Sequence, residues 1–331
     1  MKEVLQQLIE HKTLSRADAK AAMLRIAKGE INPSQTTAFM TVFMMRSVTV
    51  NEMSGFRDAM LELCIPVPVS EFDPMDLCGT GGDGKSTFNI STTVSFVVAG
   101  AGMHVAKHGN YGVSSPVGSS NVMEFLGYKF TNDIDVLRKQ IERSKVCILH
   151  APLFHPAMKN VAPIRRELGV KTFFNMLGPM INPAFVKKQM VGVFSLELAR
   201  LYGYIYAETD KRYCIAHSLD TYDEISLTAP FKLITNRGEE IYTPQDLGMN
   251  TFVHDEIKSG SNVEESAHIF LNIIQNKGTK AQNDVTLANA AAAIVCAKPG
   301  TKMLDAVEIA RESIQSGKAY QAFKTLMDNN A

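Results

Sequence analysis

From residue 75 onward, short runs of apolar residues alternate with longer stretches of helical periodicity, and this alternation restricts the fold more than any other feature of the sequence. Each run is short enough to be a buried strand, and the stretches between are long enough to be helices. We predict strands at 75–78, 103–107, 146–150, 190–195 and 212–217, and helices at 91–99, 119–126, 134–144, 156–168 and 196–209. Such alternation predicts a mostly parallel sheet flanked by helices. Further on, residues 231–243 predict a hairpin, and residues 287–297 predict a tightly packed helix.

The first 64 residues lack this alternation and predict helices only. Methionine and phenylalanine recur there at helical spacing, which is typical of a core. Pro66 and Pro68 then disfavour helix, which indicates a linker at about residues 65–74. The chain therefore predicts the α/β fold class with two domains, a small all-helical domain over 1–65 and a large α/β domain over 72–331.

Composition excludes several classes of protein. The 331 residues carry 34 basic and 34 acidic side chains, so the net charge is zero, whereas a protein that binds nucleic acid or an anionic membrane needs a broad excess of basic residues. No apolar run reaches 18 residues, and residues 1–12 do not resemble a signal peptide. The five cysteines are scattered and odd in number, as expected for reduced thiols. We expect a cytoplasmic protein with no membrane and no nucleic-acid partner.

The loop that follows the first predicted strand holds four glycines, Gly79, Gly81, Gly82 and Gly84, within six positions. Glycines allow tight turns that aim backbone N–H groups at an anion, and a helix N-terminus adds positive potential. A purely structural turn is the plain alternative. The number of glycines favours a loop that binds phosphate.

Two known phosphate-binding patterns fit the letters of this loop. A dinucleotide fingerprint needs an acidic residue about 20 positions on, but no Asp or Glu lies between Gly84 and Met123. A Walker A loop needs its helix to begin at Lys85 and Ser86 and needs a strand that ends in Asp. Here residues 87–90 look extended, and Ser91 is the better N-cap. The dinucleotide reading fails, and the Walker reading is weak but open.

The acid-free span 84–123 contains two lysines, two histidines and ten serine or threonine residues. Such a span suits a ligand with several phosphates. Its second loop begins at Lys107 and His108, at the end of another predicted strand, so we expect the two loops to converge at the carboxyl edge of the sheet.

Acidic residues appear at the end of the last of these predicted strands. Asp223 and Glu224 follow the strand at 212–217, with Asp220 nearby, and a polyphosphate substrate usually brings Mg²⁺, which takes oxygen ligands. Most Asp-Glu pairs are solvated turns, so location alone favours a metal site here.

The segment 155–183 is a third candidate region. Arg165 or Arg166 there is either a surface charge or a bidentate partner for a substrate carboxylate. The Gly-Pro and Asn-Pro breaks of this segment suggest a hinge.

Five motifs in order, at residues 79–83, 89–92, 107–110, 175–179 and 223–226, resemble those of the anthranilate phosphoribosyltransferases. The resemblance covers nearly the whole chain. It implies Mg²⁺-dependent transfer of phosphoribosyl from phosphoribosyl pyrophosphate (PRPP) to the amine of anthranilate, with release of pyrophosphate, in tryptophan biosynthesis. It also implies a cytoplasmic homodimer whose helical domain is joined by a mid-chain segment at about 165–183.

The resemblance also implies a role for individual residues. The implied catalytic residues are Lys107, Asn110 and Arg165. The implied PRPP-binding residues are Gly79, Gly82, Asp83, Thr87, Asn89, Ile90, Ser91, Thr92, Lys107, His108, Gly109, Ser115 and Ser119. Anthranilate would be bound by Gly79, Asn110, Arg165 and Gly178, and Mg²⁺ by Ser91, Asp223 and Glu224. The sequence departs from the common family pattern at Tyr111, Asn160, Ser218 and Thr221.

Other functions stay open at this point. A pyrimidine nucleoside phosphorylase-like enzyme resembles the same fold, although its characteristic phosphate motifs are not evident. A non-enzymatic nucleic-acid binder on this scaffold is disfavoured by the zero net charge. The absence of a clear Ser-His-Asp or Cys-His set does not count against the transferase, because an aromatic amine is already neutral at pH 7 and needs no strong base.

Overall fold

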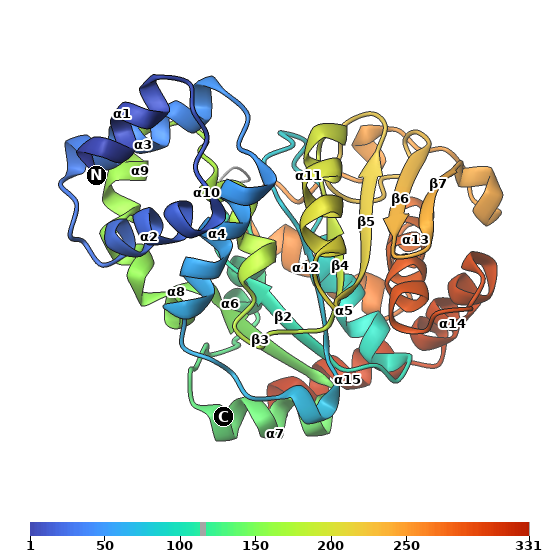
Figure 1. Ribbon diagram of the computed structural model, residues 1–331. Helices are drawn as coiled ribbons and strands as arrows, with labels where there is room; N and C mark the ends of the chain where they lie inside the picture. Colours follow the sequence, from blue (N-terminus) through green and yellow to red (C-terminus); the bar gives the residue numbers. More distant parts are fainter. Residues whose placement is uncertain (113–116, 331) are drawn as a thin grey trace. The chain divides into compact units, whose positions relative to one another are not determined.

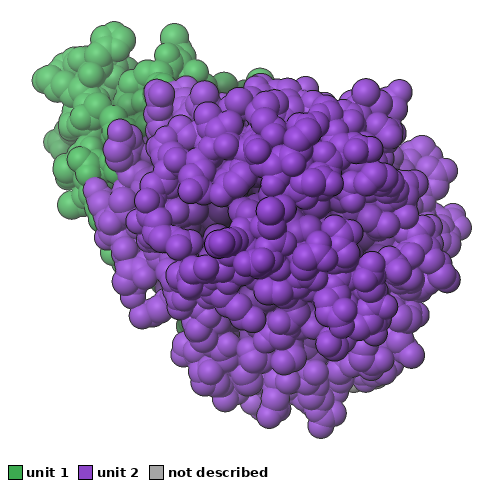
Figure 2. All heavy atoms as spheres, turned by 90° about the vertical axis from the view of Figure 1, so that its right-hand side faces the viewer, with its two compact units in different colours: residues 1–66, 152–183 green, residues 67–151, 184–331 purple. Residues whose placement is uncertain are grey.

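The computed structural model describes residues 1–112 and 117–330 (Figure 1). The chain folds into two compact units, coloured separately in Figure 2. The helical unit comprises residues 1–66 and 152–183, and the α/β unit comprises residues 67–151 and 184–331. No helix among the described residues is both long and apolar enough to cross a membrane.

The helical unit is built from short helices around a phenylalanine core. Its helices are α1 (Lys2–Ile9), α2 (Arg16–Ala27), α3 (Pro33–Met45), α4 (Val50–Glu62), α9 (Ala162–Leu168) and α10 (Phe174–Leu177), with 3₁₀ turns at Pro156–Asn160 and Gly178–Ile181. Phe39, Phe43 and Phe56 meet Phe173 with ring centroids 4.5–6.2 Å apart, and such aromatic pairs add to the stabilisation from burial. The prediction that the phenylalanine positions form a core is confirmed.

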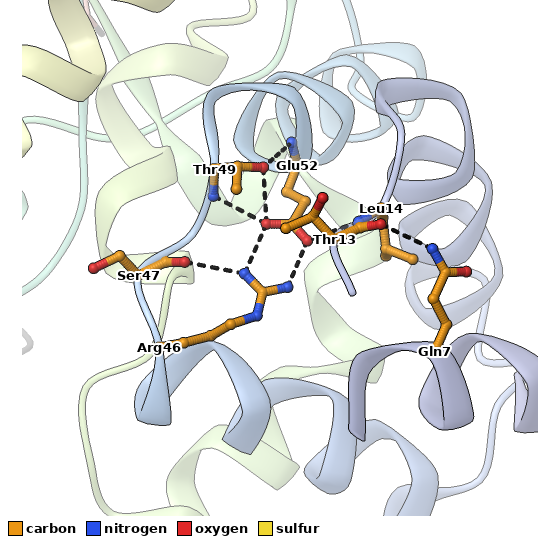
Figure 3. A network of polar contacts seen from close by, with 7 residues as sticks. All are labelled: Gln7, Thr13, Leu14, Arg46, Ser47, Thr49 and Glu52. Carbon is orange, nitrogen blue, oxygen red and sulfur yellow. Dashed lines mark hydrogen bonds and ion pairs between the residues drawn. The ribbon is translucent and has the colours of Figure 1, made fainter. Parts of the chain in front are cut away.

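A buried carboxylate organises the same unit (Figure 3). Glu52 is fully buried, and Arg46 donates to its two oxygens at 2.6 and 3.0 Å. The backbone N–H groups of Leu14 and Thr49 donate to it at 3.0 and 2.9 Å. Burial acts to raise the pKa of Glu52, but Arg46 and these N–H groups more than offset it, so the pKa lies below its usual value. This network holds the start of α4 against the turn before α2.

The α/β unit contains one seven-stranded sheet in the order β3-β2-β1-β4-β5-β6-β7. Strands β1 to β5 pair with one another in parallel, and the hairpin of β6 and β7 continues the sheet from β5 with antiparallel pairing. The strands are β1 (Met75–Gly79), β2 (Val105–Gly109), β3 (Val146–His150), β4 (Lys188–Gly192), β5 (Arg212–Ser218), β6 (Phe231–Thr235) and β7 (Gly238–Tyr242). The predicted mostly parallel sheet and the hairpin are confirmed.

Helices cover this sheet. They are α5 (Ile90–Gly100), α6 (Ser119–Phe125), α7 (Ile134–Ser144), α11 (Leu196–Ala207), α12 (Val263–Ile274), α13 (Lys280–Ala297), α14 (Met303–Gln315) and α15 (Lys318–Asp328), with α8 (Ala151–Phe154) where the chain enters the helical unit. Short 3₁₀ turns lie at Ser70–Phe72, Pro244–Leu247 and His254–Glu256. The alanine-rich α13 packs against α5, α14, β4 and β5, because its small side chains allow close approach. Its predicted role as a packed helix is confirmed.

Several predicted boundaries are wrong, and four of them have a clear physical reason. Strand β2 begins at Val105 instead of residue 103, where its partners Met75 and Val146 also begin. Strand β4 begins and ends earlier than predicted, because the buried Gln189 belongs to it. Helix α5 begins at Ile90, and Asn89, not Ser91, is its N-cap. The helix predicted over 156–168 is interrupted, since Pro163 fits only the first turn of α9.

Candidate active site

The glycine loop leaves β1 and turns sharply before α5. Gly81, Gly82, Gly84 and also Ser86 have φ between +51° and +84°, a region that glycine adopts freely and other residues rarely do. Ser86 in this conformation and a helix that begins only at Ile90 exclude the Walker A geometry. The Lys85 ammonium lies 4.8 Å from the centre of the Tyr222 ring, and the loop is therefore not built as an ATPase P-loop.

The glycine loop contacts the acidic loop directly. The N–H of Gly81 donates to Oδ2 of Asp223 at 2.6 Å, and Asp83 accepts from the N–H groups of Lys85 at 2.9 Å and Asp223 at 3.4 Å. A Cβ on Gly79 would lie 2.4 Å from Asp223 Oδ2. A side chain at that strand end would therefore displace the Asp223 carboxylate.

Lys107 lies at the centre of the site. Its side chain is 3% exposed, and its ammonium donates to the carbonyl of Leu77 at 2.7 Å and to Oγ of Ser91 at 3.0 Å. Burial lowers the pKa of Lys107, and nearby groups that include Asp76 and Glu224 partly counter this. An ammonium in so poorly solvated a place would strongly stabilise the negative charge of a polyphosphate.

Asp223 and Glu224 are both nearly buried. Burial raises the pKa of Asp223 well above its usual value, and the charges of Glu224 and Asp83 raise it further. Burial raises the pKa of Glu224 to about 7, although Lys107 and hydrogen bonds from the side chain and backbone of Ser91 lower it. Carboxylates that repel one another in this way favour a bound cation.

The donor set fits Mg²⁺ held together with its substrate. Among the residues that the structure describes, no group of three or more His, Cys, Asp or Glu side chains could hold a metal on its own. Mg²⁺ commonly binds through one or two carboxylates while phosphate and water oxygens complete its shell. Asp223 and Glu224 supply the carboxylates, and Ser91 lies beside Glu224 with its hydroxyl.

The second loop leaves β2, the neighbour of β1 in the sheet. Its Gly109 lies against Ser119, whose hydroxyl would be 2.5 Å from an added Cβ, and Ser119 donates to the carbonyl of Asn110 at 3.3 Å. The N–H of His108 donates to Asp76 at 3.1 Å. Ser115 lies outside the described residues.

The remaining predicted PRPP residues lie at the start of α5. Thr87 pairs with Lys258 in an isolated β-bridge, and the Asn89 side chain donates to the carbonyl of Val117 at 3.3 Å. The side-chain oxygen of Asn89 and the Thr92 hydroxyl are buried without a hydrogen-bond partner within the described chain. Buried polar atoms normally have partners, and these two are suited to accept from or donate to a polar ligand.

The predicted anthranilate residues fall in both units. Gly79 and Asn110 belong to the α/β unit, and the Asn110 side chain accepts from the N–H of Tyr111 at 2.8 Å. Arg165 and Gly178 belong to the helical unit. There Arg165 donates to Asn175 at 3.4 Å and lies 5.2 Å from the centre of the Phe174 ring, and burial lowers its pKa. The role of Arg165 and Gly178 stays a prediction.

Sequence reasoning missed several residues that shape this site. Asp76 and Gln189 are fully buried under it, and Gln189 donates to Asp76 at 3.2 Å. Gly192 ends β4 where a Cβ would lie 1.7 Å from the Asp223 carbonyl oxygen. Asn289 bonds the backbone beside Glu224. The only sequence signal for these is a polar residue inside an apolar run, at Asp76 and Asn289.

Comparison with known proteins agrees with this geometry. The model of the glycosyl transferase family a/b domain matches residues 71–320, and that of the helical bundle domain matches residues 2–64. The chain is 58% identical over 326 residues to the anthranilate phosphoribosyltransferase of Christiangramia forsetii, covering 98% of each chain. It is 56% identical to that of Cytophaga hutchinsonii, covering 98% of this chain and 99% of the relative.

Solved structures show the same architecture. The crystal structure of anthranilate phosphoribosyltransferase from Thermus thermophilus is 30% identical, with a TM-score of 0.93 over 98% of both chains. The Saccharomyces cerevisiae enzyme in complex with PRPP and Mg is 25% identical, with a TM-score of 0.92, over 98% of this chain and 96% of that one. These comparisons do not favour the nucleoside phosphorylase or the nucleic-acid binder.

Proposed function

Because the chain belongs to the anthranilate phosphoribosyltransferase family, we propose that its strand-end site transfers the phosphoribosyl group of PRPP to the amine of anthranilate and releases pyrophosphate, a step of tryptophan biosynthesis. The single observation that carries this proposal is the convergence of Lys107 on β2, Ser91 at the start of α5 and Glu224 in the loop after β5. An ammonium, a hydroxyl and carboxylates at one point suit a polyphosphate with its metal ion.

The reaction breaks the bond from the anomeric carbon of the ribose to the pyrophosphate oxygen and forms a bond from that carbon to the anthranilate nitrogen, which loses a proton. Bound Mg²⁺ would neutralise part of the charge on the diphosphate. Lys107 stabilises the charge that grows on the leaving oxygen, and it is preorganised for this by its bonds to Leu77 and Ser91. Asp223, Glu224 and Ser91 would hold the metal ion.

The rest of the phosphoribosyl site would be formed by the glycine loop and the start of α5. The buried unpartnered atoms of Asn89 and Thr92 would bond the ribose or its phosphates, together with the loop N–H groups. Asn110 and Arg165 would orient anthranilate, Arg165 by pairing with its carboxylate. Orientation of two reactants accounts for about 7–11 kcal/mol of a barrier at best. No strong base is required, since the aromatic amine is neutral.

The two compact units would be the domains of this enzyme, and the working form would be a cytoplasmic homodimer. Ile9, Met44 and Met45 support the dimer, because these apolar side chains are exposed on helices of the helical unit and a second copy would cover them. The five cysteines are free thiols, in keeping with a reducing compartment. Light scattering at micromolar concentration would give twice the chain mass, and Met45→Glu would shift it toward the monomer.

The activity is tested by following anthranilate fluorescence with purified protein, PRPP and Mg²⁺. We expect a loss of fluorescence that requires all components and is matched by released pyrophosphate. No loss while PRPP still binds would direct the search to other acceptors. Inorganic phosphate with a nucleoside, in place of PRPP, tests the phosphorylase alternative, and Arg165→Ala should raise the KM for anthranilate while leaving that for PRPP nearly unchanged.

A further inference from the structure

The peptide group that joins Glu224 to Ile225 is held on both sides by buried side chains from other elements. Its carbonyl accepts from the hydroxyl of Ser218, at the end of β5, at 2.8 Å. Its N–H donates to the side-chain oxygen of Asn289, on α13, at 3.0 Å. The backbone beside the acidic pair is therefore fixed from two directions.

The side chain of Asn289 bonds the backbone of Ile225 and one carbonyl of its own helix. It is 1% exposed, and its amide nitrogen donates to the carbonyls of Ile225 and Val285, both at 2.8 Å. Asparagine is less favourable than alanine inside a helix, and a buried amide is unfavourable unless it is bonded. Alanines follow it at 290–293, so packing does not require an amide there. Its partner outside α13 is the Ile225 backbone.

Ser218 closes the base of the same loop. Its hydroxyl accepts from the N–H of Ser226 at 3.1 Å while it donates to Glu224. The chain between these two residues turns through Thr221, whose φ is +76° and whose N–H donates to the Ser218 carbonyl at 2.9 Å. The two ends of the loop are thus tied to each other at Ser218 and to α13 at Asn289.

Such anchoring matters because three carboxyl groups lie close together at this site. Asp83 accepts from the N–H of Asp223 at 3.4 Å, and Glu224 is the next residue of the chain. Like charges at this range repel. The neutral bonds to the Glu224–Ile225 peptide restrain the backbone against that repulsion, and they occupy neither carboxylate.

We propose that Asn289, together with Ser218, is a positioning residue that holds the Glu224–Ile225 peptide so that the acidic pair is arranged for Mg²⁺ before the metal arrives. The proposal rests on the proposed metal role of Asp223 and Glu224. Neither Asn289 nor Ser218 touches the metal or the substrates in this scheme. Outer-shell partners of metal ligands typically contribute 10–100-fold in metal affinity.

The test measures Mn²⁺ binding by electron paramagnetic resonance in the presence of pyrophosphate, so that no turnover is needed. The variants are Asn289→Ala and Ser218→Ala. Thr286→Val is the matched control, because this buried hydroxyl lies one turn away on α13 and donates to the carbonyl of Gln282 on the same helix, at 2.8 Å. Glu224→Gln tests the underlying metal role separately, and urea unfolding reports the stability of every variant.

We expect Asn289→Ala and Ser218→Ala each to raise the Kd for Mn²⁺ by about 10-fold or more, and to raise the Mg²⁺ concentration needed for half-maximal activity in parallel. Thr286→Val should leave both values unchanged. The double variant should lose less than the product of the single effects, since both side chains hold one peptide group.

Three outcomes would overturn the proposal. The first is wild-type Mn²⁺ affinity in both variants while Glu224→Gln weakens binding, which leaves the metal role intact. The second is an equal loss in Thr286→Val, which would make the effect one of general stability. The third is unchanged affinity in Glu224→Gln as well, which would remove the metal role on which the proposal rests. If Asn289→Ala does not fold, Ser218→Ala decides between these results.

Discussion

A single added methyl group at the end of β4 would test how tightly the acidic loop is placed. In Gly192→Ala the new Cβ would lie 1.7 Å from the carbonyl oxygen of Asp223 and 2.6 Å from its carbonyl carbon. Both atoms are backbone, so rotation of a side chain cannot relieve the clash. Ordinary contact begins at 3.4 Å, and the loop backbone or the strand would therefore have to move by about 1.7 Å, the difference between those two distances.

A shift of that size would displace the acidic loop that we propose to hold the metal ion. Misplacement of catalytic groups by about 1 Å can lower a rate about 100-fold, so we expect kcat to fall by about 100-fold or more in Gly192→Ala. The Mg²⁺ concentration for half-maximal activity should rise as well, because Asp223 would no longer occupy its place. Overpacking of this kind also lowers the free energy of unfolding by about 1–3 kcal/mol, which urea unfolding would measure.

Gly203→Ala is the matched control. Its added Cβ would meet Ile215 and Ile234 at 3.9 Å, an ordinary contact. Because Gly203 lies inside helix α11, alanine there should leave kcat unchanged and raise the free energy of unfolding by about 0.5–1 kcal/mol. If Gly192→Ala folds and keeps its kcat and Mg²⁺ requirement within about threefold of wild type, the close packing of strand end and acidic loop does not govern the chemistry, and the argument fails.

Four further variants test individual charges. Glu52→Gln should lower the free energy of unfolding at pH 7 by about 3 kcal/mol in urea. The folded-state pKa of Glu52 is depressed, so its contribution is present above the unfolded pKa of 4.5 and is lost as the pH falls through the lower folded value; the gap between wild type and Glu52→Gln should close in acid. Lys107→Met should lower kcat about 100-fold in the fluorescence assay, and equal activity would contradict its role. Asp223→Asn and Glu224→Gln should lower turnover and raise the Mg²⁺ requirement, and unchanged kinetics in both would exclude that role.

The sheet and its strand-end loops could be predicted because they depend on local patterns. Apolar runs bounded by glycine or polar residues marked every parallel strand, and the parallel order placed the loops after residues 79 and 109 beside each other. The Asp-Glu pair points to a metal site only because it follows a strand. Its position in the chain is the informative signal, and its residue types alone are not.

Boundaries and long-range packing could not be predicted, since they depend on partners distant in sequence. Strand β4 begins with polar residues because Gln189, fully buried, donates to Asp76 and accepts from Tyr206 at 2.8 Å. No residue near Gln189 in the sequence predicts that it bonds Asp76 or Tyr206. In the same way, the contact of Gly192 with Asp223 joins residues that are close only in the folded chain.

The two-segment composition of the helical unit has a consequence for how the protein is made. Phe173 is stacked on Phe56 at 4.5 Å and is 1% exposed, so residues 1–66 leave the ribosome without the side chain that completes their aromatic core. At about 5–20 residues per second, the second segment follows on the order of ten seconds later. During that interval the first four helices expose apolar surface that a chaperone or another nascent copy can bind. The helical unit is the first part of the chain to be synthesised, but its folding cannot be completed until more than half of the chain has been made.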